Sequence, residues 1–169
     1  MGVRQWFREK MLGDDASGDL PPNSALLNTL LGREEERIHS LGDYRSDNYP
    51  SDLKELLGRR SEVAQELLAL EITDPAKRVE SIPRLRELLR TYPHPLVYDS
   101  LILAYVDSGR YDEAKGVAFA ASQRRAECAR SEHPEMRAEI DHLREWTSED
   151  IDDLRVEGRS LSARNQKRS

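Results

Sequence analysis

The side chains that could carry out chemistry in this chain are few. The four histidines are His39, His94, His133 and His142, and they form neither an HExxH pattern nor an i, i+4 pair. A structural zinc ion takes about four ligands held together, so this spacing predicts no metal site. We expect His94, which lies between two prolines, in a loop. We expect His142, Glu139 and Glu145 to form an ion-pair cluster on a helix surface.

Cys128 is the only cysteine, so no disulfide forms within the chain, which suits a reducing compartment. Arg124, Arg125 and Arg130 could lower the pKa of its thiol and make it reactive. We favour the alternative, a semi-buried small residue on a helix. The carboxylates come as runs. Those from 34 to 36 are typical of a solvated face, and those from 149 to 153 are typical of a helix N-terminus.

No stretch of the chain fits a phosphate-binding glycine loop, a GxSxG elbow or a dinucleotide fingerprint. Together with the histidines and the cysteine, this predicts a protein that is not an enzyme and that needs no cofactor.

The elements that would position these residues are predicted to be helices. Hydrophobic residues make up 37% of the 169 residues, charged residues 34% and aromatic residues only 6%. Thin helix packing needs fewer apolar residues than a thick core, and strands favour aromatic and β-branched residues. Apolar residues recur at helical spacing and no period-two alternation is sustained, so we expect an all-α fold with at least six helices.

The expected helices cover 23 to about 40, 51 to 68, 75 to 91, 96 to 107, 112 to 130, 134 to 146 and 148 to about 158. Ser51 is expected to cap the second helix, Gly58 is a point where that helix could break, and Pro83 is expected to kink the third or mark its true start. We divide the chain into a basic amphipathic segment with its linker (1–22), an all-helical domain (23–158) and a basic flexible tail (159–169).

One segment has a recognisable internal pattern. Its members, in chain order, are Tyr98, Leu101, Ile102, Tyr105, Gly109, Tyr111, Ala114, Ala118 and Ala121. Glycine permits the positive φ of a tight turn, and small residues let two helices approach closely. In spacing and residue type this segment resembles the tetratricopeptide repeat. A shift of 33 residues maps a degenerate copy onto Leu68, Ala69, Ile72, Leu85 and Leu88, so the repeat-like core spans about 61–126.

The resemblance implies antiparallel helical hairpins that present a concave groove to a protein partner. On that basis the candidate partner-binding residues are Gln65, Ala69, Asp99, Ile102 and Val106. The leading functional hypothesis is therefore a non-enzymatic protein–protein interaction module, as an accessory or scaffold subunit of a larger assembly.

The ends of the chain suggest an alternative. The docking candidates Arg4, Trp6, Phe7, Arg8 and Lys10 form a basic, aromatic amphipathic segment. They could place a peripheral subunit on the cytoplasmic face of a membrane protein complex that serves bioenergetics, secretion or transport, or on anionic lipid. An equally open alternative is that this segment forms a helix that packs on the chain's own helical domain.

Other partners and locations follow from the charge and the hydropathy. The net charge of −6 argues against nucleic acid as a partner. We expect no transmembrane span and no secretory signal, and hence a cytoplasmic location, with peripheral membrane contact as the alternative.

Overall fold

The computed structural model describes residues 27, 30–34, 36, 39, 44–141 and 143–166. Within these residues every regular element is a helix and no strand occurs, so the all-α prediction is confirmed. The elements are α3 (Ser51–Ala69), α4 (Pro75–Glu80), α5 (Ile82–Thr91), α6 (Pro95–Asp107), α7 (Tyr111–Arg130), α8 (Pro134–Ala138), the 3-10 helix η2 (Glu139–Asp141) and α9 (Ser148–Gln166). Among the described residues, none of the helices combines the length and the hydropathy that a membrane span requires.

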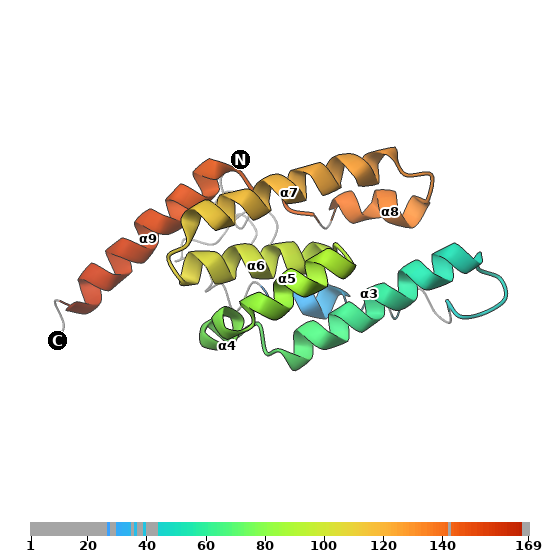
Figure 1. Cartoon of the computed structure of the whole chain (residues 1–169), viewed down its shortest axis with the longest axis horizontal. Helices are drawn as coiled ribbons and strands as arrows, with labels where there is room; N and C mark the ends of the chain where they lie inside the picture. Colours follow the sequence, from blue (N-terminus) through green and yellow to red (C-terminus); the bar gives the residue numbers. More distant parts are fainter. Residues whose placement is uncertain are drawn as a thin grey trace, which may run out of the picture.

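Helix α6 is the centre of the structure. All residues from Pro95 to Tyr105 are buried, and the helix packs against α4, α5, α7 and α9. Figure 1 shows α6 between α7 on one side and α5, α4 and α3 on the other. A helix that is apolar all round is one that neighbours cover on every side. Since each large apolar side chain contributes roughly 1.5–3 kcal/mol on full burial, α6 supplies much of the stability.

A tight turn joins α6 to α7. Gly109 has φ +74°, and its N–H donates to the carbonyl of Val106 at 3.0 Å. The N–H of Arg110 donates to the carbonyl of Tyr105 at 2.7 Å. This pair of bonds is the Schellman motif, which satisfies the last carbonyls of a helix and reverses the chain. The alanine seam of α7, which comprises Ala114, Ala118 and Ala121, is buried.

Two separate helices occupy the region around Pro83. Asp74 caps α4 by accepting from the N–H of Ala76 at 2.8 Å, and Pro75 takes the first helical position, as predicted. The helix breaks at Ser81, so Pro83 lies in the first turn of α5, where a backbone N–H would have no partner within the helix anyway. The buried Arg78 then donates to the carbonyl of Ile72 at 2.6 Å and to Asp107 at 2.6 Å. It therefore ties α4 to the chain that follows α3 and to the end of α6.

Several predicted helix boundaries are wrong. Pro50, not Ser51, is the N-cap of α3, and the helix runs through Gly58 unbroken because one interior glycine costs only about 1 kcal/mol. The helix predicted from 134 to 146 ends at Ala138, since Glu139 and Trp146 bond to different elements, Arg60 on α3 and Asp99 on α6. α9 passes the predicted end near 158 and continues to Gln166.

The degenerate copy of the repeat is not equivalent to the later segment. Leu68 is 41% exposed and Ala69 is exposed, whereas the residues onto which they map, Leu101 and Ile102, are 1% and 0% exposed. α4 also lies between α3 and α5, where a repeat would have a short turn. The two segments therefore pack differently despite their matching spacing.

Candidate functional site

Seven charged and polar side chains meet inside the described part of the structure. We call this set the buried charge cluster, and its members are Glu34, Arg60, Tyr92, His94, Arg124, Cys128 and Glu139. They come from the helical residues 30–34, from α3, from the segment that joins α5 to α6, from α7 and from η2. None of the seven is more than 9% exposed. Because buried charges are costly unless they are paired, such a concentration requires a specific arrangement of partners.

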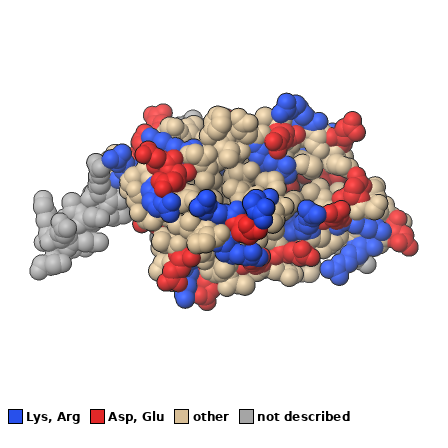
Figure 2. All heavy atoms as spheres, viewed as in Figure 1, with Lys and Arg blue, Asp and Glu red and all other residues tan. Residues whose placement is uncertain are grey.

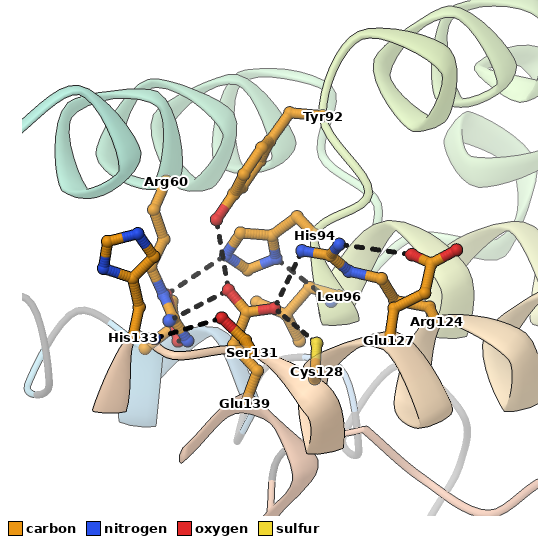
Figure 3. Close-up of polar contacts among 11 residues, drawn as sticks. Arg60, Tyr92, His94, Leu96, Arg124, Glu127, Cys128, Ser131, His133 and Glu139 are labelled. Atoms are coloured by element: carbon orange, nitrogen blue, oxygen red, sulfur yellow. Dashed lines mark hydrogen bonds and ion pairs between the residues drawn. The ribbon is translucent and has the colours of Figure 1, made fainter. Parts of the chain in front are cut away.

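Glu139 lies in the middle of the cluster. Its Oε1 accepts from the hydroxyl of Tyr92 at 3.1 Å and from Arg60 at 3.4 Å. Its Oε2 accepts from Arg124 at 3.4 Å and from the Cys128 thiol at 3.6 Å. Figure 3 shows these four side chains converging on the carboxylate, two of them from α7 and the others from α3 and the end of α5. One residue of η2 thereby holds α3, α7 and the end of α5 together.

Glu34 forms the second centre. Arg60 donates to its two oxygens through Nε at 2.5 Å and through Nη2 at 3.2 Å, a bidentate geometry. His94 Nε2 lies 3.1 Å from Glu34 Oε1, and His94 Nδ1 accepts from the N–H of Leu96 at 3.1 Å. Since Nδ1 accepts, the ring proton is on Nε2 and is donated to Glu34. His94 is thus the N-cap of α6 and a neutral partner of Glu34 at once.

The charges of the cluster balance, and the pKa values follow from burial and pairing. Two carboxylates face two guanidinium groups. Burial alone would raise the pKa of Glu34, but the hydrogen bonds from His94 and Arg60, together with the charge of Arg60, hold that pKa far below its usual range. Burial lowers the pKa of His94 despite its bond to Glu34, so the imidazole stays neutral. Burial, reinforced by the charge of Glu139, raises the pKa of Tyr92.

Cys128 and His94 are not arranged as a nucleophile and its base. Burial raises the pKa of the Cys128 thiol against the opposing effect of Arg124, so the thiol stays protonated rather than nucleophilic. Both nitrogens of His94 already have partners, so the imidazole has no position from which to accept the thiol proton. Among the residues that the structure describes, no group of three or more His, Cys, Asp or Glu side chains is placed to hold a metal ion.

A second, smaller polar site includes Asp99 on α6. Trp146 Nε1 donates to Asp99 Oδ1 at 2.6 Å, and the guanidinium of Arg144 lies 4.3 Å from the centroid of the Trp146 ring. Asp99 is 2% exposed, and its Oδ2 has no hydrogen-bond partner. Burial raises the pKa of Asp99 to about 6, against the charge of Arg144 and the bond from Trp146. This contact fixes the segment before α9 to α6.

The structure disperses the predicted partner-binding residues. Gln65 and Ala69 are exposed on α3, and Val106 is half-buried near the end of α6. Asp99 and Ile102 are 2% and 0% exposed, so the expectation that they line an open groove is corrected. The reason is that α6 is covered on all its faces. The docking candidates Arg4, Trp6, Phe7, Arg8 and Lys10 lie outside the described residues.

Several members of the cluster were predicted to be exposed to solvent, and no role was predicted for others. Glu34 was expected on a solvated face, Glu139 in a surface ion-pair cluster and His94 in a loop, yet they are 4%, 0% and 0% exposed. The expectation of a semi-buried Cys128 is closer, because this thiol is fully buried. No role was predicted for Arg60. It lies on the apolar stripe of its own helix, between Leu57 and Ala64, and that position is the signal that could have found it.

Comparisons of the chain with protein-family models, with curated proteins and with solved structures found no match.

Proposed function

We propose that this chain is a non-enzymatic protein-interaction module, an accessory or scaffold subunit of a larger assembly. The observation that carries the proposal is the orientation of the buried charge cluster. Within the cluster, the histidine, the cysteine, the tyrosine and the two carboxylates point inward and bond to one another or to the two arginines. Such a network holds helices in place and offers nothing to a substrate, so the exposed helix faces are left as the surfaces that can act.

The finer architecture belongs to this proposal. We infer that α6 and α7 form a tetratricopeptide-like hairpin. The Schellman turn at Gly109 and the buried seam of Ala114, Ala118 and Ala121 support it. In such a hairpin the small seam allows close approach of the second helix to the first. The hairpin acts here as the packed centre of the module rather than as its binding surface, since α6 is covered.

The partner surface that we propose is the outer face of α3 near its end. Gln65, Leu68 and Ala69 are exposed and share one face of the helix, because residues three and four apart lie side by side. Leu68 is 41% exposed, which makes it the apolar anchor of this face. Two of these three residues are the exposed members of the set predicted from the sequence.

The test is quantitative affinity purification of the tagged full-length chain from its native cells. The double variant Leu68→Glu with Ala69→Glu is compared with the wild type and with a control, Phe119→Glu, which introduces one glutamate at an exposed apolar residue of α7. We expect the double variant to lose a protein that the control still retains. Identical recovered proteins from all three chains would refute the α3 surface. A turnover of any substrate abolished by Glu139→Gln would refute the non-enzymatic function.

A further inference from the structure

The outer face of α7 has a pattern that its own fold does not use. The residues at positions 112, 116, 119, 123, 126 and 130 follow the alternating three- and four-residue spacing of a coiled-coil seam, and all six are exposed. They are Asp112, Gly116, Phe119, Gln123, Ala126 and Arg130, and we call them the α7 seam. The core-facing residues of the helix, such as Ala121 and Cys128, lie on the opposite side.

The middle of the seam is unusual for this chain. Between Gly116 and Ala126 every exposed residue of α7 is uncharged, although a third of the whole chain is charged. Figure 2 shows an uncharged stretch along the upper edge of the molecule, where Figure 1 places α7. Phe119 stands in this stretch and is 67% exposed. A large exposed aromatic side chain next to a glycine on the same helix face is suited to packing against a second helix.

Charge at the two ends of the seam indicates what that second helix is. Asp112 lies in the first turn of α7 and Arg130 in the last, and neither forms an ion pair among the described residues. Consider two copies of α7 that pack antiparallel, related by a two-fold axis that crosses the helices at the height of Ala121. Asp112 of each copy is then level with Arg130 of the other. Gly116 is then level with Ala126, and Phe119 with Gln123. A parallel pair would instead oppose like charges at both ends.

We propose that the chain forms a reversible dimer with a second copy of itself, through antiparallel packing of the α7 seam. The seam is self-complementary in charge, and its small residues allow close approach, as a two-fold symmetric interface requires. One helix on one helix is an interface at the small end of the range for specific complexes, so the dimer depends on protein concentration. This surface is separate from the α3 face in the proposed function.

Sedimentation velocity of the full-length chain over a wide range of concentration tests the dimer. Phe119→Ser is expected to weaken self-association roughly tenfold or more, since it removes the largest apolar contact. The matched control is Leu68→Ser, which makes the same kind of change on α3 and should leave self-association unchanged. Circular dichroism confirms that both variants fold. A chain that stays monomeric at the highest concentration, or two variants with equal effects, would overturn the proposal.

Charge exchange and cross-linking test the orientation. Asp112→Arg and Arg130→Asp should each weaken the homodimer, and a mixture of the two variants should associate. In a second experiment, Gly116→Cys and Ala126→Cys are mixed and treated with a short bismaleimide, with the wild type as background for the buried Cys128. An added Cβ at Gly116 meets nothing within 4 Å, so the variant should fold. We expect more cross-linked dimer in the mixture than in either variant alone. Stronger cross-linking of each variant with itself would overturn the antiparallel arrangement.

Discussion

Replacement of Arg60 by methionine should destabilise the protein far more than the same replacement at its neighbour Arg59. Both arginines lie on α3 and both form a short ion pair, Arg60 with Glu34 at 2.5 Å and Arg59 with Glu55 at 2.6 Å. The pairs differ in burial. The Arg60 and Glu34 side chains are 1% and 5% exposed, whereas those of Arg59 and Glu55 are 54% and 64% exposed.

The expected magnitude follows from what each variant leaves behind. Arg60→Met leaves Glu34 buried with His94 as its remaining partner in the cluster and removes one donor from Glu139. Breaking a buried pair on one side costs about 3–5 kcal/mol, because the remaining charge stays uncompensated. Exposed pairs of the Arg59 kind contribute about 1 kcal/mol or less. Since a domain has a total stability of about 5–15 kcal/mol, Arg60→Met should remove a large fraction of it.

Urea unfolding followed by circular dichroism measures both free energies of unfolding. Glu34→Gln and the double variant of Glu34→Gln with Arg60→Met complete the comparison. We expect the double variant to lose less than the sum of the two single losses, since each single change alone leaves a buried charge. Equal losses for Arg60→Met and Arg59→Met, or additive losses in the double variant, would refute the view that the cluster is a paired, desolvated unit.

Three further predictions concern pH and the backbone. The pKa of His94 is lowered in the folded state, so as the pH falls the unfolded chain binds a proton at this histidine before the folded chain does. The contribution of His94 to the free energy of unfolding is therefore fully present above the ordinary pKa of 6.5 and declines as the pH falls below it. His94→Asn, which retains a cap for α6, should flatten this decline in the urea midpoint. The pKa of Asp99 is raised from 3.8 to about 6, which has the opposite sign. Relative to Asp99→Asn, the wild type should therefore gain about 2 kcal/mol between pH 7 and pH 4.5, and an equal slope in both proteins would contradict this. Gly109→Ala should lower the melting temperature, because φ there is +74°, at a cost of about 1–2 kcal/mol. Gly58→Ala, inside α3 with open space around the added Cβ, should raise stability by about 0.5–1 kcal/mol, and thermal melts of the two variants check the opposite signs.

The His94 and Asp99 predictions can be separated because the two groups lie in different sites. His94 faces Glu34, Arg60, Tyr92 and Glu139, whereas Asp99 faces Trp146 and the charge of Arg144. In the variant His94→Asn, the pH dependence that remains in mildly acidic solution should come mainly from Asp99. Because the two contributions have opposite signs, they partly cancel in the wild type, and each single variant should show the contribution of the other group alone.

Local features of the fold could be read from the amino-acid sequence with good accuracy. The cap at Asp74, the turn at Gly109 and the bond pair between Thr147 and Asp150 all depend on residues within a few positions of one another. Most residues of α6 are apolar, which marked this segment as a helix whatever its surroundings. These features were predictable because short-range hydrogen bonds and backbone preferences settle them without reference to the rest of the chain.

The buried charge cluster could be located only in part. Arg60 and Arg124 each occupy a position on the apolar stripe of their own helix, so the sequence by itself indicates that these two charged side chains are buried. What the sequence does not give is their partners. Glu139 lies 79 residues from Arg60, and Glu34 lies 60 residues from His94.

Tertiary packing decided the rest, because the cost of burying a charge depends on what surrounds it in space. The same reason explains why Asp99 and Ile102 were assigned to a surface. The sequence determined that they lie on a helix with Leu101 and Tyr105, but not that α4, α5, α7 and α9 would cover that helix. Helical periodicity fixes which residues share a face, and only the arrangement of the other helices determines whether that face meets water.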